Sequence, residues 1–401
     1  MRFKELVLKL ELSQRTKNLK PSPTLAVTAL AAKLRAQGKD IIGLGAGEPD
    51  FDTPAHIKQA AIKAIESGDT KYTNVDGTDE LKQAIISKFQ RDNQLSYHAN
   101  QILVSCGGKH SFYNLCQAIL EPGDEAIVPA PYWVSYPPMI ELTGAKAVIL
   151  ECGLDQGFKL SPDQLESAIT DKSKLLVLNS PSNPTGAVYS IDELKALGEV
   201  IKKHPNLLVV SDDIYEAIVW LGQPYTNILS ACPELYEQTM ILNGVSKTYA
   251  MTGWRIGYAA GPAEIIKGMK TIQSQSTSNP TSISQAASVA AIAGDQRCIV
   301  PMLDAFKKRH QFVLQGLNKL NGVKCAAAGG AFYLFPSFQE VIKNKGLKND
   351  IELGEWLLDK AGVAVVPGSG FGAEGFARLS FATSDDNLSQ ALERMERLIN
   401  S

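Results

Sequence analysis

Short apolar runs alternate with longer amphipathic segments through most of the chain. A short apolar run between turn residues predicts a strand that is buried on both faces, because a half-exposed strand alternates apolar and polar residues. The predicted strands are Ile41–Leu44, Ile102–Cys106, Glu125–Val128, Ala147–Leu150, Leu175–Asn179, Leu207–Ser211 and Thr239–Leu242. Apolar positions with helical spacing predict helices at Leu25–Gln37, His56–Ser67, Gly77–Phe89, Lys109–Ile119, Ile191–His204 and Ile283–Ala293.

This alternation of strands and helices predicts the fold class. It is typical of an α/β protein with a mostly parallel, doubly wound sheet that carries helices on both faces. Ligands of such sheets bind beyond the carboxyl ends of the strands. Polar motifs follow several of the predicted strands directly, so we expect them to meet in one site.

The pattern changes after Ile299 and predicts a second, smaller α+β domain. Its expected elements are a long helix from Ile299, a hairpin-like run at Gly329–Phe335, a helix at Asp350–Ala361, strands at Val363–Val366 and Ala377–Ala382, and a final helix at Asp386–Ile399. We therefore expect an N-terminal segment (1–48) that joins the small domain, a large α/β domain (49–300) and the small domain itself (301–401).

Composition narrows the functional classes. The chain of 401 residues has 40 Lys and Arg against 42 Asp and Glu, and no basic stripe that would favour nucleic acid or a membrane surface as partner. Its six cysteines are scattered without a CxxC pair, which favours free thiols in a reducing cytoplasm over disulfides or a metal site. Residues 1–20 lack the apolar core of a signal peptide, and no apolar run is long enough to span a bilayer.

The run Asn243–Gly257 contains Lys247 eight positions ahead of Arg255. A lysine that attacks a carbonyl must lose its proton, and a nearby cation disfavours its ammonium form. The alternative is a pair of solvated surface cations, which is the commoner situation for lysine. Apolar residues in this run and directly after it favour the chemical interpretation; they are Met251, Trp254, Ile256 and Tyr258.

Two polar motifs follow predicted strands. Asn183 lies in the rigid run Asn179–Gly186, which is also compatible with an ordinary turn. Asp212 follows the strand Leu207–Ser211, with Tyr215 three residues later. The acid is compatible with a helix cap, or with a carboxylate and a phenol that face one ligand.

Three further features fit an anionic ligand. Cys106–His110 joins a strand to a helix through two glycines, and such a helix start favours phosphate, although two glycines alone are a weak signal. Trp133 lies in a loop after a strand and offers a flat apolar surface, unless it is simply a core residue. Arg378 lies in an apolar strand and needs an anionic partner, such as a substrate carboxylate.

Together these features match the needs of pyridoxal phosphate: an imine-forming lysine, an acid for the ring nitrogen, donors to the phenolic oxygen, a phosphate cradle, a stacking aromatic and a carboxylate clamp. A nucleotide is disfavoured because the chain has neither a Walker motif nor a GxGxxG run after a strand. The missing glycine fingerprint also argues against a nicotinamide-dependent dehydrogenase.

The chain resembles the class I aminotransferases of pyridoxal-phosphate fold type I, and among them the bacterial aspartate aminotransferases of the aspartate/prephenate branch. The likeness extends from Lys20–Thr24 to the C-terminal helix. Its most specific motifs are Ala46–Pro54, Pro131–Tyr136, Asn183–Gly186, Ser246–Lys247 with Met251–Tyr258, and Ala377–Ser380.

The resemblance implies a cofactor site in which Lys247, Asp212 and Tyr215 are catalytic. Lys247 would hold the cofactor as an imine and later move the proton at the substrate Cα. Asp212 would pair with the ring nitrogen, whereas Tyr215 and Asn183 would hydrogen-bond the phenolic oxygen. Trp133 would stack on the ring. The phosphate would be bound by Gly107, Gly108, Lys109 and Arg255.

The resemblance also implies substrate contacts and a homodimer with shared active sites. Tyr72 matches a tyrosine that reaches the phosphate from the partner subunit. Arg378 would bind the substrate α-carboxylate beside Gly47, near Trp133 and Asn183. The branch that the chain resembles binds the distal carboxylate with a lysine after the glycine pair and with hydroxyls of the N-terminal segment, which implies Lys109, Ser22 and Thr24. This role of Lys109 competes with its role at the phosphate. Ser274–Thr281 has no match for the arginine that the animal-type enzymes use. A lysine that matches Lys20 is associated with prephenate.

The expected reaction is the ping-pong transfer of an amino group between L-aspartate and 2-oxoglutarate. Three alternatives stay open at this stage. One is a bifunctional aspartate/prephenate or an aromatic amino-acid aminotransferase, and another is a β-lyase on the same scaffold. The third, an effector-binding module of a transcription regulator, is disfavoured because no basic helix-turn-helix stretch precedes residue 20.

Overall fold

A seven-stranded sheet forms the centre of the computed structural model, which describes residues 10–19, 23–222 and 224–401. Its strand order is β2-β8-β7-β6-β5-β3-β4. Only β8 runs antiparallel to its neighbours, so the predicted mostly parallel sheet is confirmed. The strands are β2 (Ile102–Ser105), β3 (Glu125–Ala130), β4 (Lys146–Glu151), β5 (Ser173–Asn179), β6 (Leu208–Asp212), β7 (Thr239–Gly244) and β8 (Gly257–Ala260).

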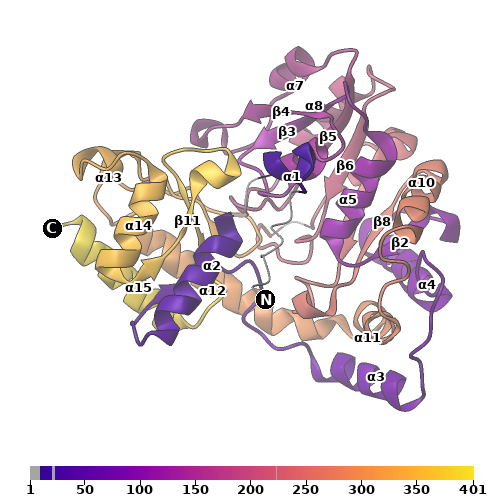
Figure 1. Cartoon of the computed structure of the whole chain (residues 1–401), viewed down its shortest axis with the longest axis horizontal. Coiled ribbons are helices and arrows are strands. Elements are labelled where there is room, and N and C mark those ends of the chain that lie inside the picture. The colour runs from indigo at the N-terminus through magenta and orange to yellow at the C-terminus, as the bar shows by residue number, and fades with distance from the viewer. Residues whose placement is uncertain (1–9, 20–22, 223) are drawn as a thin grey trace, which may run out of the picture.

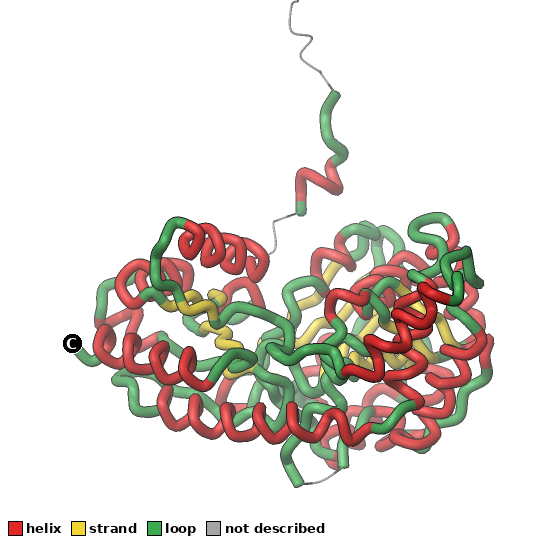
Figure 2. The backbone as a smooth tube through the Cα atoms, turned by 90° about the horizontal axis from the view of Figure 1, so that it is seen from below, coloured by secondary structure: helices red, strands yellow, loops and turns green. Residues whose placement is uncertain are grey.

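Helices cover both faces of this sheet (Figures 1 and 2). Successive residues of β5 belong to different hydrophobic cores: Leu175 and Val177 face one, and Leu176 and Leu178 face the other. Both faces are therefore buried, which explains why the strands read as continuous apolar runs. The first core is completed by α5 (Gly108–Ile119), α6 (Tyr136–Glu141) and α10 (Ala263–Ser274). The second is completed by α3 (Ala55–Glu66), α4 (Asp79–Lys88), α8 (Ile191–Ile201) and α11 (Ser282–Ala293).

The C-terminal elements form a separate lobe in Figure 1 around their own core. In this lobe β9 (Tyr333–Leu334) and β11 (Val366–Pro367) flank β12 (Ala377–Ser380) in an antiparallel sheet. The N-terminal β1 (Ile42–Gly43) pairs with β10 (Val363–Ala364) of this lobe. Its helices are α12 (Val300–Leu317), α13 (Gln339–Asn344), α14 (Asp350–Ala361) and α15 (Asp385–Ile399), with α2 (Pro23–Ala36) packed beside β10 and β11.

Two predictions for this lobe are wrong in detail. Gly329–Phe335 is not a local hairpin, because Tyr333 and Leu334 pair with β12 instead. Gly330 is needed there for close packing, since an added Cβ would lie 2.5 Å from the carbonyl oxygen of Ile218. The predicted strand Val363–Val366 is divided at Val365 between β10 and β11, which belong to different sheets.

Side-chain caps fix the starts of two helices that cover the sheet. The hydroxyl of Thr78 accepts a hydrogen bond from the Leu81 amide and caps α4. Ser190 and Glu193 form a capping box at the start of α8. The sequence analysis did not predict α1 (Gln14–Asn18), α6, α7 (Pro162–Ala168), α9 (Ile228–Ala231), α10, α13 or β8.

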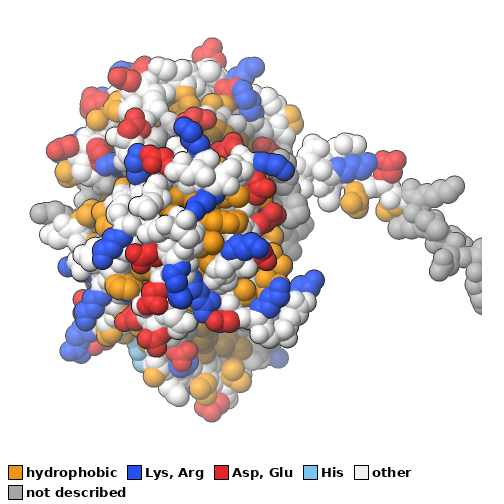
Figure 3. Space-filling view, turned by 90° about the vertical axis from the view of Figure 1, so that its left-hand side faces the viewer, with side chains coloured by type: hydrophobic (Ala, Val, Ile, Leu, Met, Phe, Trp, Pro, Cys, Tyr) orange, Lys and Arg blue, Asp and Glu red, His pale blue; other side chains and the backbone are white. Residues whose placement is uncertain are grey.

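The molecular surface carries mixed charges. On the face shown in Figure 3, Lys and Arg side chains are interspersed with Asp and Glu, in keeping with the net charge of −2. Residues 10–19, which include α1, extend away from the body of the molecule (Figure 2). None of the helices in the described part of the chain combines the length and the hydrophobicity that a membrane crossing requires.

Candidate active site

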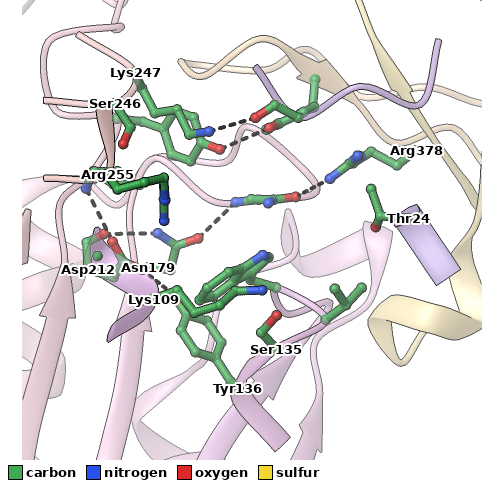
Figure 4. Close-up of a pocket in the computed structure, with 18 residues that line it drawn as sticks. Thr24, Lys109, Ser135, Tyr136, Asn179, Asp212, Ser246, Lys247, Arg255 and Arg378 are labelled. Carbon is green, nitrogen blue, oxygen red and sulfur yellow. Dashed lines mark hydrogen bonds between the residues drawn. The ribbon is translucent and has the colours of Figure 1, made fainter. Parts of the chain in front are cut away.

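A cavity of about 370 Å³ lies at the carboxyl ends of the central strands and is closed by residues of the C-terminal lobe and the N-terminal segment. Figure 4 shows Lys247 and Ser246 on one side, Arg378 and Thr24 on another, and Lys109, Ser135 and Tyr136 below them. The lining residues are Thr24, Gly47, Gly108, Lys109, Trp133, Val134, Ser135, Tyr136, Asn179, Asn183, Asp212, Ile214, Tyr215, Ser246, Lys247, Arg255, Tyr333 and Arg378.

Most of the predicted site residues meet in this cavity. Those that line it are Lys247, Asp212, Tyr215, Asn183, Trp133, Gly108, Lys109, Arg255, Gly47, Thr24 and Arg378. Gly107 is the residue before the lining residue Gly108 and caps the start of α5. Tyr72 does not line the cavity of this single chain, and its side chain is 92 % exposed. The predicted Lys20 and Ser22 lie outside the described residues.

Lys247 follows the end of β7, and its Nζ donates a 2.6 Å hydrogen bond to the carbonyl oxygen of Gly47. Burial, joined by the positive charges of Arg255 and Arg378, lowers the pKa of Lys247 to about 8. Glu48 and Asp212 oppose this effect on the pKa. The cation Arg255 therefore contributes as predicted, but desolvation has the larger influence. The result is an amine that is partly unprotonated near neutral pH.

Asp212 ends β6 and faces the cavity. Its Oδ2 accepts a 2.5 Å hydrogen bond from the Tyr136 hydroxyl, and its Oδ1 accepts one of 3.3 Å from the Ile214 amide. Burial raises the pKa of Asp212, whereas the bonds from Tyr136 and Ile214 and the charge of Lys247 lower it. A ligand cation next to this carboxylate would offset the cost of its burial.

Arg378 is an almost fully buried cation, with 2 % of its surface exposed. It donates from one terminal nitrogen to Asn183 Oδ1 at 3.0 Å and from the other to the Gly45 carbonyl at 2.7 Å. Its Nε has no hydrogen-bond partner, and it makes no ion pair within the described ranges. The guanidinium lies 4.5 Å from the ring centre of Tyr333. Burial lowers the pKa of Arg378. Such an arrangement fits an anion supplied by a ligand.

Tyr215 and Tyr333 share a hydrogen bond of 2.9 Å between their hydroxyl groups. Burial raises the pKa of Tyr215 well above its ordinary value, so its phenol stays protonated and available as a donor. The side chain of Asn183 is fixed by Arg378, and its backbone amide donates to Asn179 Oδ1 at 2.8 Å. These residues form one polar wall of the cavity.

The start of α5 provides an anion cradle. Gly107 has a φ of 92° and its added Cβ would lie 2.2 Å from a terminal nitrogen of Arg255, so only glycine fits there. The first amides of a helix have no partner within it and attract anions. Arg255 is held over this helix start by its bonds to the carbonyls of Thr252 (2.7 Å) and Cys106 (3.4 Å).

Lys109 and Thr24 offer donors at a different part of the cavity wall. The Nζ of Lys109 lies 5.1 Å from the ring centre of Trp133, as in a cation–π contact. Burial, together with the charge of Arg255, lowers the pKa of Lys109. The Oγ1 of Thr24 is buried and has no hydrogen-bond partner among the residues that the structure describes. Both groups are free to bind a second anionic group.

Several residues of the site were missed by the sequence analysis. Asn179 donates a hydrogen bond of 2.9 Å to the backbone carbonyl of Asp212 and so holds the end of β6. The Tyr136 hydroxyl holds the Asp212 carboxylate. Tyr333 contacts both Tyr215 and Arg378. Asn179 was a polar residue at the end of an apolar strand, and this signal was available from the sequence. Tyr333 lay in an apolar run and gave no such signal.

Comparison with known proteins decides the family. The model of the family described as aminotransferase class I and II matches residues 39–395. The chain belongs to this family. This aminotransferase is 56 % identical to the aspartate/prephenate aminotransferase of Nitrosomonas europaea over 98 % of its own length and all of the relative's. It is 50 % identical to the aspartate aminotransferase of Geobacillus stearothermophilus, with the same coverage.

Solved structures agree with the sequence relatives. The aspartate aminotransferase of Rhizobium meliloti superposes with a TM-score of 0.94 at 46 % identity, covering 98 % of this aminotransferase and 99 % of the other chain. The aspartate aminotransferase of Thermus thermophilus, solved with maleate, gives a TM-score of 0.92 at 44 % identity, with coverage of 97 % and 100 %. The predicted class I aminotransferase and its fold type I are confirmed.

A second acid behind Asp212 makes the stability of this aminotransferase depend on pH. Asp213 is fully buried and accepts hydrogen bonds from Ser211 Oγ (2.6 Å) and Asn227 Nδ2 (2.8 Å). Burial, together with the charge of Glu216, raises its pKa to about 7. Protonated Asp213 therefore adds to the free energy of unfolding. This contribution is fully present below the ordinary aspartate pKa and is lost as the pH rises through about 7.

Replacement of Asp213 by asparagine keeps the neutral form at every pH. The free energy of unfolding of D213N, relative to the wild type, should therefore rise by about 2 to 3 kcal/mol between about pH 5 and about pH 8. Urea unfolding at a series of pH values measures this difference. A difference that is the same at every pH would show that Asp213 is ionised throughout.

Proposed function

We propose that this aminotransferase transfers the amino group of L-aspartate to 2-oxoglutarate by a pyridoxal-phosphate ping-pong mechanism. The observation that carries the proposal is the meeting, in one cavity, of a lysine whose pKa is about 8 with a buried carboxylate and a buried arginine that lacks an anion. The relatives named above are aspartate or aspartate/prephenate aminotransferases, and they match nearly the full chain.

The residues of the cavity fit pyridoxal phosphate. The glycine-bounded start of α5 suits a phosphate, as does Arg255, whose guanidinium packs closely against Gly107. Asp212 suits the protonated ring nitrogen, because a cation there offsets the burial that raises the pKa of this acid. Tyr215, as a protonated phenol, and Asn183 suit the phenolic oxygen, and Trp133 suits the ring face. Tyr136 and Asn179 orient Asp212 for this contact.

Pyridoxal phosphate, when bound, supplies an aldehyde that condenses with amines and a ring that withdraws electrons from the substrate Cα. Lys247 Nζ is the attacking amine in the resting enzyme. Once an amino acid has replaced it, Nζ would be a free base that moves the proton between the substrate Cα and the cofactor. In the ligand-free cavity, the charges of Arg255 and Arg378 lower the pKa of Lys247 and favour its neutral form.

Substrate recognition is divided between the two ends of the cavity. Arg378 binds the α-carboxylate, and its unpartnered Nε provides a free donor for a bidentate contact. Gly47 lies beside it, and an added Cβ there would lie 3.3 Å from the Tyr333 hydroxyl. Lys109 and Thr24 bind the distal carboxylate, with Ser22 as a further hydroxyl. Support comes from the unsatisfied Thr24 Oγ1 and from the maleate, a dicarboxylate, in the Thermus thermophilus structure.

The proposal includes a homodimer with shared active sites. Its support is the 92 % exposed side chain of Tyr72, which a partner subunit would cover at its own phosphate site. Ile62 and Ile65 of α3 are also exposed, at 44 % and 54 %, and would be buried with it. A cytoplasmic location is part of the proposal and is supported by the six free cysteines.

We further propose that residues 1–48 and 301–401 form one small domain beside a large domain of residues 49–300. Support comes from the pairing of β1 with β10 and from a core that joins Ile42 and Leu44 to residues of α12, α14 and α15. Closure of the N-terminal segment over substrate would exclude water from the reacting atoms.

A second candidate function is a bifunctional aspartate/prephenate aminotransferase, with Lys20 as an additional contact. It is favoured by the name of the Nitrosomonas europaea relative. A donor–acceptor profile distinguishes the candidates. Purified full-length enzyme would be assayed with Asp, Phe, Ala and cystathionine as donors to 2-oxoglutarate and to prephenate, and with Glu as donor to oxaloacetate and to prephenate. The proposal expects Asp and Glu to be the best donors; a preference for Phe, or β-elimination from cystathionine, would contradict it.

Substitution of Lys109 tests whether this residue binds the distal carboxylate of the substrate or the phosphate of the cofactor. In the variant Lys109→Ala, kcat/KM for aspartate should fall by about 10- to 100-fold more than kcat/KM for phenylalanine, because only aspartate carries the distal carboxylate. Thr24→Val is the matched variant at the same end of the cavity and should show a smaller effect of the same kind. An equal loss for both donors would assign Lys109 to the phosphate instead.

A further inference from the structure

A buried carboxylate behind the active site has no role in the proposed mechanism. Glu216 follows Tyr215, and its side chain is only 10 % exposed. Its Oε1 accepts a 2.7 Å hydrogen bond from Asn243 Nδ2, and its Oε2 accepts one of 3.1 Å from Asn93 Nδ2. Lys88, whose side chain is 6 % exposed, forms an ion pair with the same carboxylate. Three donors from two segments that are distant in sequence thus converge on Glu216.

Further hydrogen bonds determine which atoms of Asn243 and Asn93 donate and which accept. The Oδ1 atom of Asn243 accepts a hydrogen bond of 2.7 Å from the Gly244 amide. The Oδ1 atom of Asn93 accepts one of 2.8 Å from Lys88 Nζ. Both amide oxygens are therefore engaged, and both NH₂ groups must face acceptors. A carboxylate meets this requirement because it only accepts, whereas a glutamine amide would turn a donor toward donors.

Asn243 lies near the end of β7, four residues before Lys247. The chain passes closely against its neighbour strand at this point, since an added Cβ on Gly244 would lie 3.0 Å from the Ile256 carbonyl oxygen. The Asn243 side chain holds the Gly244 amide, and Glu216 holds the Asn243 side chain. The direction in which the chain leaves β7 toward Lys247 therefore depends on Glu216.

We propose that Glu216 is a positioning residue that acts through Asn243 to hold Lys247 Nζ in its buried place against the Gly47 carbonyl. The inference rests on the proposed role of Lys247. Glu216 also joins the two sides of the site, because it follows Tyr215 on the Asp212 segment and binds the start of the Lys247 segment. Lys88 neutralises its charge from α4, so that Glu216 acts by hydrogen bonding rather than as a free anion near the cofactor.

The test measures the amine of Lys247 directly in the full-length, cofactor-free protein. Trinitrobenzenesulfonate modifies unprotonated amines, and mass spectrometry of the peptide that contains position 247 gives the labelling rate at each pH. In E216Q, Lys247 should leave its desolvated place, while Glu48, Arg255, Arg378 and Asp212 stay around it. The midpoint of its labelling profile should rise by about one pH unit, which makes the free amine about tenfold scarcer near pH 7.

A double variant that exchanges donor and acceptor between positions 216 and 243 tests whether Glu216 acts on Lys247 through its hydrogen bond with Asn243. In the double variant E216Q/N243D, the new glutamine donates to the new aspartate, which still accepts from the Gly244 amide. The midpoint should return to the wild-type value. The control is D213N, because Asp213 is a neighbouring buried acid whose side chain contacts Ser211 and Asn227 instead. It should change the unfolding free energy without moving the Lys247 midpoint.

The possible outcomes are distinct. An E216Q midpoint equal to that of the wild type, or an equal shift in D213N, would overturn the inference, and so would a shift that the double variant does not reverse. If E216Q does not fold, N243A removes the same link and should raise the midpoint similarly. Failure of the proposed function has a different signature: the wild type itself would form no borohydride-stable bond between Lys247 and pyridoxal phosphate.

Discussion

Replacement of Lys247 by alanine is expected to lower kcat by at least about 10⁴-fold with every amino donor. The variant loses the side chain that combines a pKa of about 8 with a hydrogen bond to Gly47 in the cavity. It loses both the amine that binds the aldehyde and the base that moves the Cα proton. Steady-state kinetics and the visible spectrum of the cofactor-saturated protein measure the two losses separately, and the imine absorption should vanish with the activity.

The control for this experiment is Lys247→Arg. Arginine keeps the length and the positive charge of the side chain, but its guanidinium stays protonated and forms no imine with the aldehyde. It should be as inactive as the alanine variant while restoring the cation near Asp212. Substantial turnover in either variant, or an unchanged spectrum, would show that another amine carries the chemistry.

Replacement of Arg378 by methionine is expected to lower kcat/KM by a similar factor for aspartate, glutamate and phenylalanine. The arginine is proposed to bind the α-carboxylate, which all amino acids share. Loss of a buried, hydrogen-bonded charge contact costs about 2 to 5 kcal/mol, so the common factor should be about 30- to 5,000-fold. A loss confined to dicarboxylates would move Arg378 to the distal carboxylate.

The same substitution should have the opposite effect on the ligand-free protein. Arg378 is buried, its Nε is unpartnered, and burial lowers its pKa, so the folded chain carries the cost of a desolvated cation. Methionine removes this cost, and the melting temperature of the cofactor-free protein should rise by about 2 to 4 °C. The matched variant Arg378→Lys keeps a charge without the planar fork and should gain neither stability nor activity. A lower melting temperature for the methionine variant would indicate that Arg378 stabilises the fold.

The sequence predicted the strand ends, and with them the convergence of the site. Asp212, Asn183 and Lys247 each follow a buried apolar run, and the parallel sheet brings the ends of such runs to one edge. Arg378 was predicted because a charged residue in an apolar strand is costly unless a partner exists. These predictions use only local patterns, which the fold leaves intact.

The contacts that orient these residues were not predictable. The hydrogen bond from Tyr136 to Asp212 spans 76 residues, and that from Arg378 to Asn183 spans 195. Tyr333 was hidden because Gly329–Phe335 has the glycines of a hairpin turn, yet its strand pairs with β12 far along the chain. No local pattern specifies which distant strand a short apolar run will join.

The sequence also did not show how strongly charge and burial each change the pKa of Lys247. The neighbouring Arg255 was visible in the same run and was expected to lower the pKa. Burial has the larger effect on this pKa, and Lys247 is enclosed by segments that are distant in sequence, such as that of Gly47, 200 residues away. The roles of Lys20 and Ser22 stay predictions, because these residues lie outside the described part of the chain.

One measurement tests the central claim most directly. Full-length protein is saturated with pyridoxal phosphate, reduced with sodium borohydride, digested and analysed by mass spectrometry. We predict a yellow protein that loses its colour on reduction and carries the pyridoxyl phosphate mass on Lys247 alone. A colourless protein, or a reduced sample in which Lys247 is unmodified, would contradict the proposal.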